Sequence, residues 1–138
     1  MKKRTAAITA VGAYLPDFVL TNELLETMVD TTDEWITTRT GIKERRILKE
    51  KNAGTSFMAI RAAEDVLKKS GTDASEIDFI LVATATPDMP VAATAAYVAS
   101  QIGATNAFAY DLQAACSSFL YGMSTAASYI ESGRYKKI

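Results

Sequence analysis

The stretch IDFILVATATP, residues 77–87, constrains the fold more than any other part of this sequence. It is a continuous apolar run, rich in β-branched residues, that ends at a proline. Runs of this kind are typical of a strand that is buried on both faces of a parallel sheet. We therefore predict a buried strand here, at the centre of the fold.

Segments with helical spacing lie on both sides of this strand. The first covers residues 56–69 and is followed by Gly71, a common helix terminator. Its apolar residues approximate one helix face: Met58, Ile60, Ala63, Val66 and Leu67. A second helix is expected over residues 93–102, ending at Gly103.

The same alternation continues after residue 103. NAFAYDLQ, residues 106–113, predicts another short strand, and residues 117–132 predict a helix rich in Ala, Ser and Gly. So much small and apolar surface indicates burial between layers. The order strand, helix, strand, helix argues for an α/β fold with a mostly parallel sheet.

The N-terminal part predicts smaller elements. A first strand is expected over residues 6–14 and a turn at Pro16, and Asn22 is the predicted cap of a short helix that runs to Met28.

The stretch DTTDEWITTRTGIKERR predicts a second short helix in this region. Thr31 and Glu34 have the spacing of a capping box, and Gly41 lies where the helix would end. The expected helix covers residues 33–40. Residues 42–48 are consistent with either a short charged strand or a loop.

Composition excludes several classes of function. The net charge of −1 lacks the basic field on which nonspecific nucleic-acid binding depends. One cysteine and no histidine leave no zinc ligand set and no internal disulfide. The basic start resembles a signal peptide, but its apolar run is short and contains Gly12, so we expect a strand of a cytoplasmic protein. No stretch is apolar enough for a membrane span.

The only cysteine, Cys116, stands where the strand over 106–113 gives way to the helix from 117. The thiolate is the reactive form of cysteine, and a free thiol has a pKa of about 8.5. The unpaired N–H groups and dipole of a helix N-terminus favour negative charge by roughly 0.3–1 kcal/mol. Cys116 is therefore a candidate nucleophile, whose own N–H could stabilise an oxyanion on a thioester. A small, inert, buried cysteine is the competing interpretation.

The segment DLQAACSSF resembles the nucleophile segment of the condensing enzymes of the thiolase superfamily. A narrower resemblance comes from MVDTTDEWITTRTGIKERR, which is similar to the helix and loop characteristic of β-ketoacyl-acyl carrier protein synthase III. GAYLPDFVLTNELLE before it, and ILVATATPD and AACSSF after it, occur in the same order as in that family. The resemblance spans all 138 residues but only about the first half of the family's length.

This resemblance implies a thiolase-like layered α-β-α-β-α fold, of which residues 1–138 form the first half. The ending GRYKKI agrees with this expectation, since Ile138 has the character of the first residue of a further strand. The resemblance places the family's His and Asn catalytic partners in a second half that this sequence does not contain. The fragment alone is expected to be inactive.

The resemblance also implies an activity, in which Cys116 attacks a short acyl-coenzyme A, with acetyl-coenzyme A the expected substrate. The acyl group then condenses with malonyl-acyl carrier protein to give 3-ketoacyl-acyl carrier protein, coenzyme A and CO2. A homodimer with no permanently bound cofactor and no metal is expected. The alternatives are a coenzyme A-dependent synthase of secondary metabolism, of quinolone or polyketide type, a noncatalytic partner subunit, or a thiol redox protein. The presence of Cys116 argues against the subunit, and the lack of a second cysteine argues against the redox protein.

The resemblance assigns coenzyme A binding to Trp35 and Arg39, with Thr31 near the adenine. The first two are four residues apart, so both project from one helix face and can offer a stacking plane and a cation. Without the resemblance, a packed tryptophan with a neighbouring cation is the simpler interpretation. For Thr31, a capping role explains the threonine equally well.

Two further features concern selectivity and charge. Many relatives have a Phe-Pro pair shortly after TPD, whereas this chain has Val91 and Ala92 there, which puts its acyl-chain selectivity in doubt.

A basic stretch is a solvated face or, alternatively, a contact for an acidic carrier protein or coenzyme phosphates. It consists of Lys43, Arg45, Arg46, Lys49 and Lys51.

Overall fold

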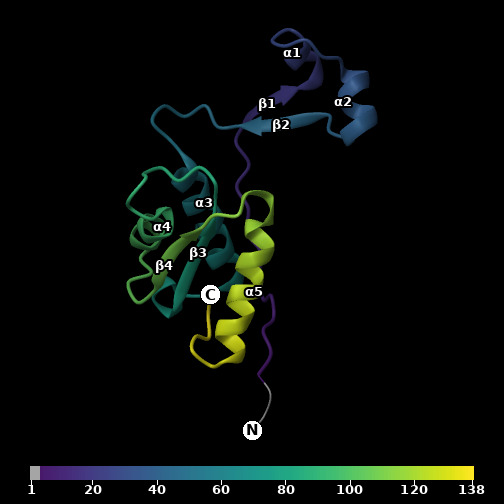
Figure 1. The fold of residues 1–138 in the computed structure, drawn as a ribbon. Helices are drawn as coiled ribbons and strands as arrows, with labels where there is room; N and C mark the ends of the chain where they lie inside the picture. The colour runs from purple at the N-terminus through teal and green to yellow at the C-terminus, as the bar shows by residue number, and fades with distance from the viewer. Residues whose placement is uncertain (1–3) are drawn as a thin grey trace. The chain divides into compact units, whose positions relative to one another are not determined.

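The computed structural model describes residues 4–138, which fall into two units (Figure 1). Of the described residues, unit 1 comprises 4–14 and Gly54–Ile138, and unit 2 comprises Leu15–Ala53. Unit 1 carries the parallel strands and the longer helices, whereas unit 2 is a small α/β unit with an antiparallel pair. No helix within residues 4–138 is long and apolar enough to cross a membrane.

The sheet of unit 1 is the parallel pair β3, Phe79–Ala83, and β4, Phe108–Leu112. The two strands pair in register from Phe79 opposite Phe108 to Ala83 opposite Leu112. Their carboxyl ends therefore lie at the same edge of the sheet. Both predicted strands and their parallel arrangement are confirmed.

Three helices accompany this sheet: α3 (Thr55–Ser70), α4 (Thr94–Ile102) and α5 (Ser118–Glu131). The first two end at Gly71 and Gly103, with φ of 64° and 79°. Only glycine adopts this left-handed conformation readily, so the predicted helix ends are confirmed. Two single turns of 3-10 helix, η1 (Ala74–Glu76) and η2 (Ala115–Ser117), complete the unit.

The helices cover the two strands from both sides (Figure 1). On one side α5 packs so closely that a Cβ on Gly122 would lie 3.2 Å from Leu81 Cδ2. On the other side α4 lies against both strands, and α3 packs against α4. Phe79 is only 2% exposed and contacts three tyrosine rings, those of Tyr110, Tyr129 and Tyr135. The core of unit 1 therefore surrounds the start of β3.

The rest of β3 is less buried than the sequence predicts. Residues 80–82 are half-buried and Ala83 is exposed, although full burial on both faces was expected. Within residues 4–138 β4 is the only strand paired with β3, so its other edge is not covered by a strand. Just before β3 begins, the N–H of Asp78 donates to the carbonyl of Lys137, 2.9 Å away.

The strand predicted over residues 6–14 is wrong. These residues form no strand in the structure, because no neighbouring strand within residues 4–138 supplies ladder hydrogen bonds. They run along α3 instead: the Ala13 N–H donates to Asp65 Oδ2 at 2.9 Å. A Cβ on Gly12 would lie 2.5 Å from the backbone nitrogen of Val66, so the backbones approach closely there.

In unit 2, β1 (Phe18–Thr21) pairs antiparallel with β2 (Glu44–Ile47). The short helix α1 spans Asn22–Glu26. Its cap is Thr21, whose hydroxyl accepts the N–H of Leu24 at 3.2 Å, so the prediction that Asn22 caps this helix is wrong. The amide of Asn22 is instead fully buried, with partners elsewhere in the unit.

The helix predicted over residues 33–40 is confirmed as α2, Asp33–Thr40, which ends at Gly41 with φ of 71°. The capping role expected for Thr31 is wrong by one residue. Thr32 is the cap, because its hydroxyl accepts the N–H of Trp35 at 3.1 Å. The segment after Gly41 forms the strand β2, which resolves the choice between strand and loop.

Candidate active site

Cys116 lies in η2, the single turn between the end of β4 and the start of α5. Its side chain is exposed, so the interpretation of a buried cysteine does not hold. The turn is closed by Ser117 N–H, which donates to the carbonyl of Ala114 at 3.0 Å. Because α5 begins immediately afterwards, the thiol stands at the end of that helix where unpaired N–H groups favour an anion.

The backbone of this turn is strained at Ala115, which has φ of 46°. Within residues 4–138, the only other non-glycine residue with positive φ is Asn52 in a turn. An alanine in this region costs about 1–2 kcal/mol, because its Cβ crowds the following carbonyl. The surrounding structure must therefore hold the turn that presents Cys116.

A second loop reaches the same edge of the sheet, since residues 84–93 follow β3 as the cysteine turn follows β4. The Thr84 N–H donates to the carbonyl of Leu112 at 3.2 Å, so the first residue after β3 is bonded to the last residue of β4. The loop is also fixed to α3: Thr55 donates to the carbonyl of Thr86 at 2.6 Å, and the Asp88 carboxylate accepts the N–H of Ser56. This loop is therefore anchored beside the cysteine turn.

Asp111 fixes a third element at this edge. Its carboxylate oxygens accept the N–H groups of Thr94 and Ala95, both at 2.7 Å. These are the first residues of α4, where N–H groups have no partner within the helix. Asp111, near the end of β4, thus attaches α4 to the strand that leads to Cys116. It is the cap that the sequence of α4 does not itself provide.

Trp35 and Arg39 lie together on α2, as their spacing predicts. The Arg39 guanidinium carbon is 4.6 Å from the centre of the indole ring, and one of its N–H groups points to the Trp35 carbonyl at 3.4 Å. Trp35 is 53% exposed, so it does not serve as a core anchor. The pair presents a cation stacked on an accessible aromatic plane, which suits a base or phosphate.

The buried amide of Asn22 holds α2 within unit 2. Its Nδ2 donates to Asp33 Oδ1 at 2.7 Å and to the carbonyl of Ile42 at 2.8 Å, and its Oδ1 accepts Arg45 at 2.7 Å. The hydrogen bonds of Asn22 and then Thr37 keep the pKa of Asp33 below its ordinary value. Asn22 thereby links the helix of Trp35 to β2.

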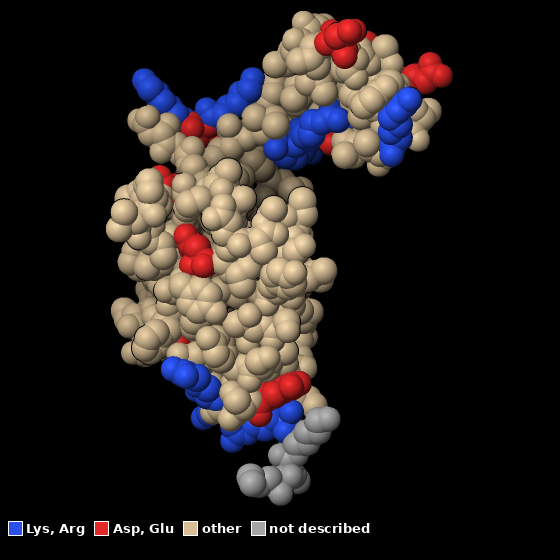
Figure 2. Space-filling model, in the orientation of Figure 1, with Lys and Arg blue, Asp and Glu red and all other residues tan. Residues whose placement is uncertain are grey.

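The basic stretch is largely engaged within unit 2. Arg45 bonds Asn22, Arg46 donates to the carbonyl of Pro16 at 3.3 Å, and Lys49 lies 3.3 Å from the centre of the Phe18 ring. Figure 2 shows Lys and Arg side chains gathered on unit 2 and few charged side chains over the middle of unit 1. Unit 2 nevertheless carries more acidic than basic residues, so its overall charge does not by itself favour an anionic ligand.

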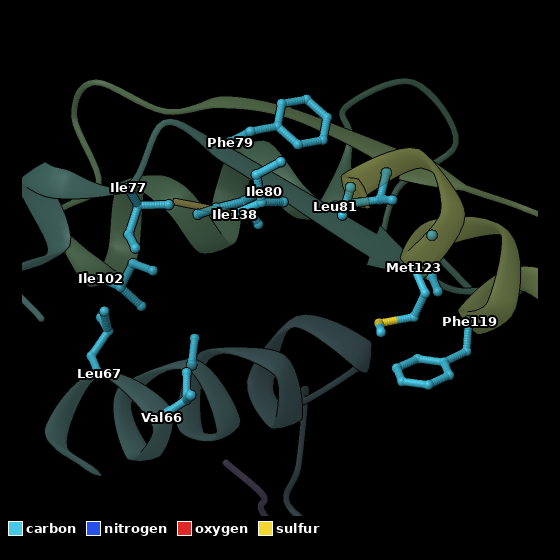
Figure 3. A pocket seen from close by; sticks show the side chains of 14 residues that line it. Val66, Leu67, Ile77, Phe79, Ile80, Leu81, Ile102, Phe119, Met123 and Ile138 are labelled. Atoms are coloured by element: carbon cyan, nitrogen blue, oxygen red, sulfur yellow. The ribbon is translucent and has the colours of Figure 1, made fainter. Parts of the chain in front are cut away.

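A further hollow of about 270 Å³ lies beside β3 and is almost entirely apolar. Side chains from α3, β3 and α5 face it (Figure 3), among them Val66, Leu67, Ile80, Leu81, Phe119 and Met123. Cys116 does not line it. With no polar group to orient a substrate, this hollow offers no chemistry of its own.

The structure brings together only part of the predicted site. Trp35 and Arg39 are in contact, but they belong to unit 2 with Thr31, whereas Cys116 belongs to unit 1. Sequence reasoning missed Asp111 and the buried Ser118, whose hydroxyl accepts the Ala114 N–H at 2.7 Å. The sequence signals available for them were an aspartate near the end of a strand, Asp111, and a serine at the start of a helix, Ser118.

No group of His, Cys, Asp and Glu side chains within residues 4–138 is arranged to hold a metal ion.

Comparison with known proteins gives consistent matches. The sequence profile of the family described as 3-Oxoacyl-[acyl-carrier-protein (ACP)] synthase III matches residues 110–138, which include the end of β4, the turn that holds Cys116, and α5. The chain is 55% identical over its whole length to beta-ketoacyl-[acyl-carrier-protein] synthase III 2 of Bacteroides thetaiotaomicron. It is 56% identical to the synthase III of Phocaeicola vulgatus. In both cases it spans 41% of the relative's length.

Solved structures show the same fold. The 3-oxoacyl-[acyl-carrier-protein] synthase III of Aquifex aeolicus superposes on 95% of this chain with a TM-score of 0.86 at 46% identity. The priming β-ketosynthase of the R1128 polyketide pathway superposes on 95% with a TM-score of 0.88 at 37% identity. The matched parts are 41% and 39% of those chains. The thiolase-like fold expected from the sequence is confirmed for the part that this chain covers.

Proposed function

We propose, since the chain belongs to the β-ketoacyl-[acyl-carrier-protein] synthase III family, that it forms the first half of an enzyme that initiates fatty-acid synthesis. Residues 1–138 are the N-terminal half of a thiolase-like condensing enzyme in this proposal. The chain spans about two fifths of the relatives' length, so the second half is expected to supply the histidine and asparagine of the decarboxylation step.

In the proposed reaction, the Cys116 thiolate attacks the carbonyl carbon of an acyl-coenzyme A. A new carbon–sulfur bond forms, the bond to the coenzyme sulfur breaks, and coenzyme A leaves as a thiol after it takes a proton. Malonyl-acyl carrier protein then loses CO2, and the resulting carbanion attacks the acyl-cysteine. The product is 3-ketoacyl-acyl carrier protein, and the cysteine thiolate is restored.

The observation that carries this proposal is the exposed thiol of Cys116 on the turn between β4 and α5. The helix that follows runs for 14 residues, and its first N–H groups favour both the thiolate and an oxyanion on the thioester. The identities of 55% and 56% support the assignment, because they extend over the whole chain, including this turn.

Trp35 and Arg39 are the proposed contacts for the nucleotide end of coenzyme A, with Thr31 beside the adenine. The support is the exposed indole with its stacked guanidinium, which offers a ring face for a purine and a charge for phosphate. No permanently bound cofactor is proposed, and the acyl-coenzyme A, expected to be acetyl-coenzyme A, is a substrate.

Val91 and Ala92 occupy the loop that neighbours the cysteine turn, and we propose that they influence the choice of primer. Val91 is 98% exposed within this chain, so it is free to contact a substrate or a second copy. The exposed loop and the exposed Phe108 of β4 support the homodimer expected for the family. A cytoplasmic location and recognition of malonyl-acyl carrier protein belong to the same proposal.

Priming of a polyketide is the second candidate function. It is favoured by the TM-score of 0.88 with the priming β-ketosynthase of the R1128 pathway. The two candidate functions differ in the substrate that accepts the acyl group. The fatty-acid enzyme should strongly prefer malonyl on the carrier protein of fatty-acid synthesis. Comparison of product formation with carrier proteins of the two kinds decides between them.

Intact-mass analysis tests the central step. The complete enzyme that contains these residues, incubated with acetyl-coenzyme A alone, should gain the mass of one acetyl group, and the Cys116→Ala variant should gain none. A complete enzyme that stays unmodified, or a Cys116→Ala variant that is acetylated equally, would contradict the mechanism.

Trp35→Ala tests the nucleotide contact. It should raise the half-saturating concentration of acetyl-coenzyme A about tenfold, because a stacking contact is worth roughly 1–2 kcal/mol, and leave the maximal acylation rate unchanged.

A further inference from the structure

The turn that presents Cys116 adopts a conformation that its own residues do not favour. Ala115 has φ of 46°, in the left-handed region, and Ala114 has φ of −149° and ψ of 36°. Neither alanine has a polar side chain that could stabilise this geometry. Such a conformation persists only where neighbouring groups hold it in place.

Ser118 is the neighbouring group that does so. Its hydroxyl oxygen accepts the N–H of Ala114 at 2.7 Å, while the carbonyl of Ala114 accepts the N–H of Ser117 at 3.0 Å. Both backbone groups of Ala114, just before the left-handed Ala115, are thereby bonded to residues that follow it. The segment from Ala114 to Ser118 is closed into a ring that contains Cys116.

Ser118 is itself fixed to the body of unit 1. It is only 3% exposed, and Gly122, one helical turn further on, is also buried. Residues four apart share a helix face, and at Gly122 this face meets the side chain of Leu81 in β3. By contrast, Phe119 and Leu120, the two residues directly after Ser118, are exposed. The hydroxyl therefore connects the cysteine turn to the face of α5 that packs on the sheet.

We propose that Ser118 is a positioning residue for Cys116: its hydroxyl holds the left-handed turn at Ala115 and so sets the direction in which the sulfur is presented. This inference rests on the proposed function, in which Cys116 accepts the acyl group. Without the hydroxyl, the Ala114 N–H loses its partner and the turn relaxes toward ordinary backbone conformations. Small misplacements of a nucleophile lower the rate of attack more than they lower substrate binding.

The test is single-turnover acetylation of the complete enzyme at increasing acetyl-coenzyme A concentration. Ser118→Ala should lower the maximal rate about tenfold and leave the half-saturating concentration unchanged, because the nucleotide contacts are on α2. Ser117→Ala is the matched control: it removes an exposed hydroxyl and should acetylate at the wild-type rate.

Two rescue variants separate positioning from simple destabilisation. Ser118→Thr retains the hydroxyl and should restore most of the rate. Ala115→Gly removes the cost of the left-handed conformation, so combining it with Ser118→Ala should also restore most of the rate. A Ser118→Ala rate within twofold of the wild type, or no recovery in either rescue variant, overturns the inference.

Hydrogen exchange at the Ala114 amide keeps this inference distinguishable from the proposed function. The amide should be protected in the wild type and exchange at least tenfold faster in Ser118→Ala, whether or not the enzyme accepts an acyl group. If the wild type is never acetylated but this difference is observed, the proposed function fails while the positioning of the turn stands. Equal exchange in both proteins overturns the positioning itself.

Discussion

Replacement of Asn22 by alanine is expected to unfold unit 2 before the rest of the chain. The side chain is fully buried and its hydrogen bonds connect three parts of the unit: Asp33 on α2, the carbonyl of Ile42 after that helix, and Arg45 on β2. The variant removes the shared partner of all three. A unit of this size has little other core with which to compensate.

The magnitude follows from the bonds that are lost. A neutral hydrogen bond contributes about 1 kcal/mol, and one to a charged group about 1.5–3 kcal/mol. Asn22 makes one strong bond of the first kind, to Ile42, and two of the second, to Asp33 and Arg45. We therefore expect a loss of roughly 4–7 kcal/mol in the free energy of unfolding of this unit.

Trp35 is the only tryptophan and lies on α2, so its fluorescence reports directly on unit 2. Urea titrations followed by this fluorescence should show a much lower midpoint for Asn22→Ala. The matched control is Thr27→Ala, because Thr27 is exposed in the same unit and its hydroxyl donates a single bond, to the carbonyl of Leu24 at 2.7 Å. The control should lose less than about 1 kcal/mol. An Asn22→Ala midpoint equal to that of the control would refute the reasoning.

Three further changes test other parts of the structure. Gly12→Ala should lower the melting temperature by several degrees, through a loss of about 1–3 kcal/mol, because the new Cβ would lie 2.5 Å from the backbone nitrogen of Val66. Asp111→Ala should cost roughly 1–3 kcal/mol and increase hydrogen exchange in the first turn of α4, whose N–H groups lose their cap. Acid should weaken unit 2 through Asp33, since the Asn22 hydrogen bond lowers its pKa. That contribution is complete above the unfolded-state pKa of about 3.9 and is lost as the pH falls through the folded-state pKa, so the stability difference from Asp33→Asn, followed by Trp35 fluorescence, should shrink below about pH 4.

Local sequence signals were sufficient for most elements and for the main candidate residues. The ends of α3 and α4 were predicted from Gly71 and Gly103, because a left-handed terminator acts on the helix turn just before it. The contact between Trp35 and Arg39 follows from their four-residue spacing on one helix. The turn at Cys116 was predicted because the strand signal before it and the helix signal after it are both local.

Only the tertiary structure decided which groups support these residues. The segment over 6–14 has the composition of a strand, but its anchoring partner is Asp65 on α3, 52 residues beyond Ala13. Asn22 has the local signal of a helix cap, yet its amide is buried against groups 11 to 23 residues away. Composition and spacing describe what a residue can bond within a few positions of itself. Partners across the fold are selected by packing, which no short window of sequence contains.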